Sequence, residues 1–440
     1  MRLIFVFIAL SLLMAWAGST PPGDAPGAYT TLVVGLLLLS GYAAGHVLSR
    51  LRLPRITGYL CVGMLTGPYL MGFLTGEAVG QLGFLNELAV TFIALAAGGE
   101  LRMAELRERM SVILHSILSQ TTIVFIIVTT FVFLAAPLLP FTASFSYLQL
   151  LTVGTLFGVL AVARSPSSAI AIVNETRATG PFTETALGVT VALDVFVIVL
   201  FGAAISFCEV VMSPAAALDL GFIAGLSVEV LLGIGAGLGV GLALGFYIDR
   251  VRANLPLLLL GTALLVTSIS HGFAAYLKEA YGLSIHLEPL LICVTAGFTV
   301  QNVSRQGSRF IEAIESVGLP VYVLFFTLAG AGLNLDALMQ TWTVAILLVG
   351  VRAGAIYLSA YAGGRLGGDP PRFNRIAGLA YLTQAGVSLG LALEVTRRFP
   401  GWGDAFVTVI VAVIAVNQMI GPIAMKQALV RAGETREVQY

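Results

Sequence analysis

Long apolar stretches recur along almost the whole chain and decide what it can fold into. A helix that crosses the hydrocarbon core of a bilayer needs about 20 mostly apolar residues. Thirteen stretches of roughly that length follow one another: residues 30–49, 55–75, 82–99, 111–136, 147–173, 183–207, 220–247, 255–277, 288–303, 313–333, 340–364, 374–396 and 404–428. The sequence therefore predicts an all-α integral membrane protein of about 13 transmembrane helices joined by short loops.

The composition excludes the main soluble classes. Of the 440 residues, 58% are hydrophobic and only 10% are charged, whereas an ordinary soluble domain carries about 25% charged residues. So few charges cannot cover the water-exposed surface of a globular protein of this size. We therefore expect the lipid bilayer as a partner, and we expect neither a soluble enzyme nor a nucleic-acid binder.

The two ends of the chain suggest how it is processed. Residues 1–17 combine Arg2, an apolar core and the small residues Ala15 and Ala17 around Trp16, which is typical of a secretory signal peptide. The alternative is an uncleaved extra helix. Residues 30–428 then form one transmembrane domain, and residues 429–440 form a short tail.

The positive charges predict the orientation, because cytoplasmic loops of membrane proteins carry an excess of Lys and Arg. Of the 23 basic residues, Arg2 lies in the N-terminal stretch and two lie within predicted spans. If the first span starts outside, only Lys278, Arg397 and Arg398 lie on the outer side, and the remaining 17 lie on the inner side. We therefore expect an external N-terminus after signal removal and a cytoplasmic C-terminus.

Three ionisable residues lie within predicted spans. Arg164 falls in the fifth span, Asp194 near the centre of the sixth and Arg352 in the eleventh. An ionisable group inside the membrane is costly and marks a functional site by default. Asp194 is the best candidate for binding a proton or a cation, and the alternative is that it serves only as half of a structural Asp–Arg pair.

Two spans contain weak points in an otherwise apolar helix. The fifth reads Arg164-Ser165-Pro166, and the twelfth contains Thr383 and Gln384 before a glycine. Proline lacks an N–H and disfavours helical geometry at the preceding residue, although a proline-kinked structural helix is the alternative. Matching interruptions in two halves of a chain indicate inverted repeats with a transport site between them.

Enzymatic chemistry has no support in the sequence. The three cysteines are isolated and the four histidines lack ligand spacing, so a zinc site is not predicted. Neither H-E-x-x-H nor G-x-S-x-G occurs in a suitable context. We expect no enzymatic activity, no cofactor and no metal other than a transported ion.

Several segments carry a resemblance to a known family. From about residue 30 onward the chain resembles the monovalent cation:proton antiporter superfamily, with a sodium/hydrogen exchanger-like membrane domain. The matching segments are 55–68, 97–101 and 163–166, Asp194, Arg352, and 383–386.

The resemblance implies a core domain, a dimerisation domain and a homodimer in the plasma or inner membrane. In the core, two discontinuous helices cross near an essential aspartate, whose place Asp194 takes. The family's break usually reads Thr-Asp-Pro, and its aspartate helix usually reads Asp-Asp or Asn-Asp. Here they read Arg164-Ser-Pro and Leu193-Asp194, so the companion of the essential aspartate is missing.

Two hypotheses of transport follow. In the first, an antiporter exchanges Na⁺ or K⁺ for protons by alternating access. Asp194 and Ser165 would bind the ion, and Arg352 would compensate charge; with a single carboxylate the exchange would be electroneutral. In the second, a surplus positive charge at Arg164 suits a proton-coupled transporter of anions or organic solutes. If Arg164 pairs with Asp194, the carboxylate is less available to bind an ion, so this pairing is the open question.

Overall fold

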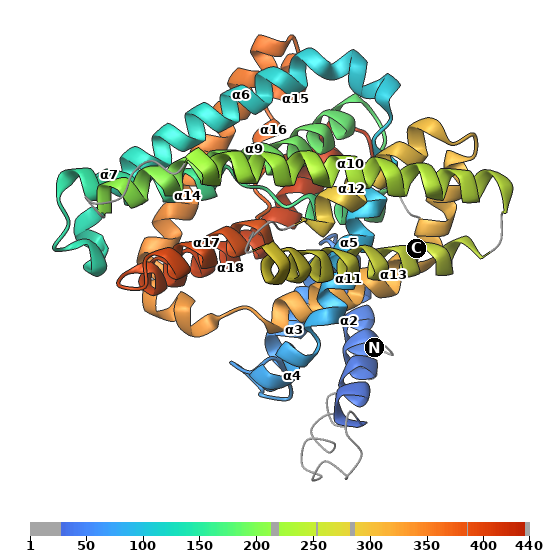
Figure 1. The fold of residues 1–440 in the computed structure, drawn as a ribbon, viewed down its shortest axis with the longest axis horizontal. Coiled ribbons are helices and arrows are strands. Elements are labelled where there is room, and N and C mark those ends of the chain that lie inside the picture. Colours follow the sequence, from blue (N-terminus) through green and yellow to red (C-terminus); the bar gives the residue numbers. More distant parts are fainter. Residues whose placement is uncertain (1–27, 213–219, 252–253, 282–286, 385, 436–440) are drawn as a thin grey trace. The chain divides into compact units, whose positions relative to one another are not determined.

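The regular secondary structure of the described residues is all helical, and these residues contain no strand. The computed structural model describes residues 28–212, 220–251, 254–281, 287–384 and 386–435. The signal-peptide prediction for residues 1–17 lies outside these ranges. Figure 1 follows the helices along the chain, from blue near the N-terminus to red near the C-terminus.

Each predicted span coincides with one helix or with a short series of helices. The elements are α2 (Ala28–Arg50), α3 (Arg55–Thr66), α4 (Gly76–Gln81), α5 (Gly83–Glu100), α6 (Met103–Leu134), η1 (Ala136–Leu138), η2 (Pro140–Thr142), α7 (Tyr147–Val162), α8 (Pro166–Thr176), α9 (Pro181–Met212), α10 (Leu220–Arg250), α11 (Leu255–Tyr281), α12 (Pro289–Val303), α13 (Gly307–Ala331), α14 (Leu335–Gly367), α15 (Pro371–Asn374), α16 (Ala377–Ala380), α17 (Gly386–Arg398) and α18 (Gly403–Ala432).

Nine helical segments of the described residues are long and apolar enough to cross a membrane. They correspond to α2, α6, α7 with α8, α9, α10, α11, α13, α14 and α18. The other predicted spans coincide with α3, α5, α12 and the series α15–α17. The chain is therefore an all-α protein with many apolar helices, and the count of thirteen crossings stays a prediction.

Some predicted boundaries were wrong. The second span was expected to reach residue 75, but α3 ends at Thr66. Gly67 is extended there and Pro68 follows, and proline disfavours helical geometry in the residue before it. In contrast, α6 and α14 extend beyond their predicted spans. Helix α6 already begins at Met103, and α14 runs from Leu335 to Gly367. Their polar ends could not be recognised from hydropathy.

The described residues form two compact units. The first contains the residues up to Glu100, together with Ala236–Phe273 and Pro289–Asn334. In this unit α5 packs very closely against α12, since a Cβ on Gly98 would lie 1.9 Å from the Val294 carbonyl oxygen. Glycine therefore permits backbone contact between these helices, as is common between membrane helices.

The second unit contains Leu101–Gly235, Ala274–Glu288 and the residues from Leu335 onward. Within it, α6 packs against α7, α9 and α14, whereas α18 packs against α14 and α17. Every residue singled out as a candidate site residue lies in this unit. The second unit is therefore the part of the molecule in which the site is built.

Candidate transport site

The first helix break lies between α7 and α8, as the sequence predicted. Helix α7 ends at Val162, and α8 begins at Pro166, whose missing N–H is tolerated at the first helical position. Ser165 is the N-cap of α8, and its Oγ accepts a hydrogen bond from the Ser168 backbone N–H at 3.3 Å. Ser165 and Pro166 therefore start the second half-helix of this break.

The second break lies between α16 and α17. Helix α16 ends at Ala380, and α17 begins at Gly386. Thr383 lies in the interruption and is buried. A Cβ on Gly421 of α18 would lie 2.8 Å from the Thr383 Cα, so glycine is what lets α18 approach the interrupted backbone.

Gln384 holds the second break through neutral hydrogen bonds. Its Nε2 donates to the Leu160 carbonyl at 3.0 Å and to the Ser388 Oγ at 3.1 Å. Its Oε1 accepts from the Asn417 Nδ2 at 2.8 Å. Because Leu160 belongs to α7 and Asn417 to α18, Gln384 links both to the second break.

Arg352 joins the two breaks directly. Its Nε donates to the Ala161 carbonyl and its Nη2 to the Ala163 carbonyl, each at 3.0 Å. Its Nη1 donates to the Leu382 carbonyl in the second break, also at 3.0 Å. The side chain is only 2% exposed, so these three carbonyls replace water as its hydrogen-bond partners.

Arg164 lies in the first break and points back to the end of α7. Its Nη1 donates to the carbonyls of Ala161, Val162 and Ala163 at 2.7–3.1 Å, and its Nη2 donates to the Gln120 Oε1 at 3.1 Å. The final carbonyls of a helix lack partners within the helix and carry partial negative charge. Arg164 and Arg352 therefore both stabilise the C-terminal end of α7.

Asp194 lies on α9, and one of its two carboxylate oxygens lacks such a partner. Its Oδ1 is buried without a hydrogen-bond partner in the described structure. No ion pair within 4 Å joins it to an arginine among the described residues. The question raised by the sequence is thereby answered, because Arg164 does not form a close pair with Asp194.

Helix α9 is anchored near both ends. At its start, the Glu434 carboxylate accepts hydrogen bonds from the backbone N–H groups of Phe182 and Thr183, at 2.9 and 2.8 Å. At its far end, the Glu209 Oε1 lies 2.6 Å from the Arg398 Nη1 of α17. These contacts fix the helix that carries Asp194 within the second unit.

Arg109 of α6 adds a further contact near the start of α9. It donates to the Thr185 Oγ1 at 3.0 Å and forms an ion pair with Asp369, which precedes α15. Burial raises the pKa of the Asp369 carboxyl above its ordinary range, and the Arg109 guanidinium opposes this rise. Arg109 therefore links three segments of the second unit at this end of α9.

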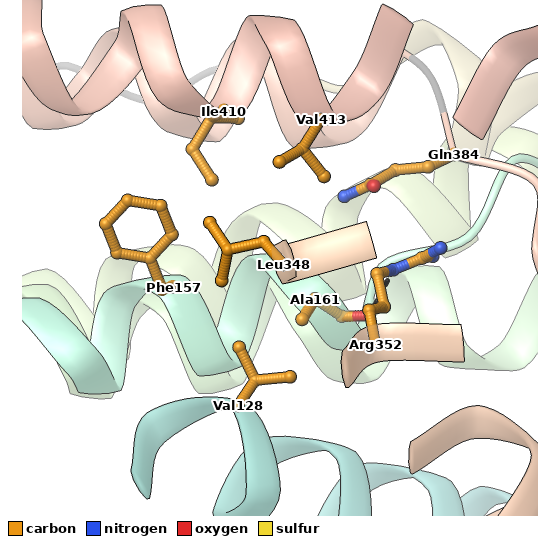
Figure 2. A pocket seen from close by; sticks show the side chains of 8 residues that line it. All are labelled: Val128, Phe157, Ala161, Leu348, Arg352, Gln384, Ile410 and Val413. Carbon is orange, nitrogen blue, oxygen red and sulfur yellow. Dashed lines mark hydrogen bonds between the residues drawn. The ribbon is translucent and has the colours of Figure 1, made fainter. Parts of the chain in front are cut away.

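A small, largely apolar pocket adjoins the place where the breaks meet. Figure 2 shows Arg352 and Gln384 at one end of it, with apolar side chains such as Phe157 and Leu348 around the rest. The pocket contains no carboxylate. Its lining therefore offers no charged ligand to a cation.

The structure brings most of the predicted residues together and adds others. Hydrogen bonds tie Arg164, Arg352 and Gln384 to the end of α7. Sequence reasoning missed Gln120 and Asn417, both about 1% exposed or less. Each is an amide side chain inside a predicted apolar span, and that unusual position was the signal that could have identified them.

The sequence also matches a known protein family. The chain matches the family described as "Sodium/hydrogen exchanger, transmembrane" over residues 33–430. The chain belongs to this family. Its members are membrane exchangers, so the chain is a multi-pass membrane transporter of the sodium/hydrogen exchanger family rather than a member of an enzyme family.

Solved structures support the fold of this exchanger. Two structures of the sodium proton antiporter MjNhaP1 from Methanocaldococcus jannaschii are similar to it, with TM-scores of 0.60 and 0.68. The sequence identities are 17% and 18%, and the alignments cover 91% and 92% of this chain and 98% of each of the others. No curated protein matches the sequence. At this identity the likeness establishes the fold alone.

Proposed function

We propose that the protein exchanges a monovalent cation, Na⁺ or K⁺, for protons across a membrane, and that Asp194 is the group both ions use. The observation that carries the proposal is the buried Asp194 Oδ1, which has no hydrogen-bond partner in the described structure. A carboxylate in such a place is stabilised either by taking up a proton or by binding a cation. The family match supports sodium and hydrogen ions as the cargo.

Oxygen atoms near the breaks would complete the cation site. Ser165 contributes a hydroxyl at the start of α8, and interrupted helices expose carbonyl oxygens that can coordinate alkali ions. Several carbonyls at the end of α7 already accept from arginines. Ser165 is therefore the side chain best suited to assist Asp194, while Arg164 and Arg352 keep the interrupted backbone in place.

A single carboxylate favours electroneutral exchange. Leu193 occupies the position where the family usually has an acid or an amide, and it is fully buried. One carboxylate holds either one proton or one monovalent cation at a time. Each turnover would then exchange one charge for one charge, and an imposed membrane potential would leave the rate unchanged.

Alternating access would come from movement of one part of the molecule relative to another. The two compact units offer the required parts, with the second unit as the core domain and the first as the dimerisation domain of a homodimer. The excess of basic residues in the inner loops supports a cytoplasmic C-terminus. The proposed architecture also includes thirteen membrane crossings and inverted repeats.

Transport of anions or organic solutes has less support. It would require Arg164 to bind the solute, but its Nη1 and Nη2 already donate to three backbone carbonyls and to Gln120. Only its Nε is without a partner in the described structure, and that atom is buried. Replacement of chloride by gluconate in the transport assay separates the two functions. An anion carrier would lose activity, whereas a cation antiporter would keep it.

The decisive experiment replaces Asp194 with asparagine. Proteoliposomes containing a pH-sensitive dye would be exposed to NaCl, KCl or choline chloride gradients. We expect cation-driven proton movement with the unaltered protein, and with Asp194→Asn we expect the rate of protein-free liposomes. The matched control is Asp336→Asn, because Asp336 is an exposed carboxylate at the start of α14. An unchanged rate with Asp194→Asn would exclude the proposed role.

A further inference from the structure

Helix α9 begins without a side-chain cap from the residue before it. That residue is Gly180, which has no side chain, and the first helical residue is Pro181. The first N–H groups of a helix have no partner within the helix, so side chains, water or ligands must accept their hydrogen bonds. Helix α8, in contrast, is capped by the hydroxyl of Ser165 directly before it. The start of α9 must therefore take its acceptor from a more distant part of the chain.

Glu434, which follows α18, supplies that acceptor. Its Oε1 accepts from the Phe182 N–H at 2.9 Å, and its Oε2 accepts from the Thr183 N–H and the Thr183 Oγ1, each at 2.8 Å. Its backbone carbonyl accepts from the Thr179 N–H at 3.0 Å. A negative charge is also favourable at the N-terminal end of a helix. One residue of the C-terminal tail thus holds the segment that starts α9 through four hydrogen bonds.

Two glycines allow this contact. Gly433 ends α18 in the left-handed conformation, with φ 76°, which glycine adopts without a steric penalty. Gly180 has φ +150°, and a Cβ there would lie 2.5 Å from the Glu434 Cδ and 2.7 Å from its Oε1. A side chain at position 180 would therefore displace the carboxylate, so the start of α9 is shaped to receive it.

The contact joins two helices that otherwise pack little against each other. Helix α9 packs mainly against α6 and α7, whereas α18 packs mainly against α14 and α17. Helix α9 carries Asp194, about three turns beyond Thr183. Helix α18 carries Asn417, which donates to Gln384 in the second break. Glu434 therefore ties the helix of the proposed ion-binding carboxylate to the helix that supports the second break.

We infer that Glu434 is a positioning residue, which holds the start of α9 against the end of α18 and so fixes the position of Asp194 relative to the helix breaks. The inference deepens the proposed function and rests on it. Glu434 contacts neither ion in this scheme and acts only through the position of α9. Because a small displacement of a positioned group is costly, loss of Glu434 should weaken cation binding.

The first measurement follows the α9 amides directly and does not use transport. Hydrogen–deuterium exchange of the full-length protein in detergent, read by mass spectrometry after proteolysis, reports on the segment that begins at Pro181. In Glu434→Ala the Phe182 and Thr183 N–H groups lose their acceptor. We expect their exchange to become about fivefold faster or more, as for the loss of a helix cap.

A soluble carboxylate should reverse this change. Acetate has the size of the group that Glu434→Ala removes, so choline acetate should restore slow exchange at Phe182 and Thr183. Choline chloride at the same ionic strength should not restore it. Gly180→Ala should also accelerate the exchange, but acetate should not reverse that effect, because the added Cβ occupies the place of the carboxylate.

Transport in proteoliposomes tests the positioning role. With Glu434→Ala we expect the KM for the cation to rise severalfold, with a smaller change in the maximal rate per folded protein. A contact that only stabilises the fold would reduce the amount of folded protein and leave the KM in place. Glu434→Gln keeps the size of the side chain but only one acceptor oxygen, so it should be intermediate in exchange and in KM. It also carries the test if Glu434→Ala does not fold.

The matched control is Asp404→Ala, because Asp404 is an exposed carboxylate at the opposite end of α18. It should leave both the α9 exchange and the KM unchanged. Unchanged exchange in Glu434→Ala, exchange that acetate does not slow, or a KM equal to that of Asp404→Ala each overturn the inference. Absence of cation-driven proton movement in the unaltered protein rejects antiport instead, and the exchange and acetate measurements then decide whether Glu434 holds α9.

Discussion

The two helix breaks meet at one place but are stabilised by different chemistry. At the first break, the carbonyls at the end of α7 accept hydrogen bonds from two guanidinium groups, Arg164 and Arg352. At the second break, the side chains of Gln384 and Asn417 form a neutral chain of amides. Arg352 crosses from one to the other through the Leu382 carbonyl.

This difference assigns separate tasks to the breaks. Hydrogen bonds from ionised groups are roughly twice as strong as those between neutral groups, and positive charge suits the negative end of a helix. The first break is therefore stabilised by charge. The second break is stabilised without charge, so changes there should alter stability more than the protonation of the carboxylate.

Replacement of Arg352 should affect both breaks and should have the largest effect on stability and antiport. Arg352→Gln leaves the Leu382 carbonyl without a side-chain donor and removes one donor from each of Ala161 and Ala163. We expect the free energy of unfolding to fall by about 3–5 kcal/mol, at the upper end of single-substitution effects, and antiport to be lost. Thermal unfolding in detergent and the proteoliposome assay would measure both.

The control for this variant lies on the same helix. Arg365→Gln removes an exposed arginine near the end of α14 and should change the unfolding midpoint little. If Arg352→Gln unfolded at the same temperature as Arg365→Gln, the two breaks would not depend on a shared guanidinium. Arg352→Lys should be intermediate, because a lysine ammonium lacks the planar fork that reaches separated carbonyls.

An intermediate effect is expected at the neutral break. Asn417→Leu leaves the Gln384 Oε1 buried without its donor, which costs about 1–3 kcal/mol of the free energy of unfolding. The pH dependence of cation-driven proton movement in proteoliposomes should stay unchanged, since no charge is moved. The neighbouring Gln418→Leu is the control, because the Gln418 Oε1 is buried without a partner in the described structure. A shifted pH dependence in Asn417→Leu would show that the second break also affects the protonation of Asp194.

The sequence was sufficient for the fold class and for the location of both breaks. Pro166 and the polar residues Thr383 and Gln384 interrupt apolar spans, and such interruptions are local features. The family resemblance was also confirmed. Hydropathy could not predict that α3 ends at Thr66, since the apolar residues continue beyond it.

The partners of the buried charges could not be predicted in the same way. Arg164 bonds to a residue 44 positions earlier in the chain, and Arg352 to carbonyls 189 and 191 positions away. Such contacts depend on how helices pack, and a guanidinium has several acceptors within reach in any crossing of two broken helices. The sequence therefore left open whether Arg164 pairs with Asp194. Only the side-chain positions in the structure show that the two residues do not form an ion pair.

The smallest effect is expected at the N-cap of α8. Ser165→Ala removes the Oγ that accepts from the Ser168 N–H, and loss of a serine N-cap typically costs about 1 kcal/mol. If Ser165 also binds the cation, the KM for Na⁺ or K⁺ should rise severalfold in Ser165→Ala and stay near its original value in Ser165→Thr. The control is Ser167→Ala, whose Oγ makes only a 3.3 Å contact with Ser165. Equal KM values for Ser165→Ala and Ser167→Ala would leave Ser165 as a helix cap alone, and the first break would then stabilise the site through charge without supplying a side-chain ligand.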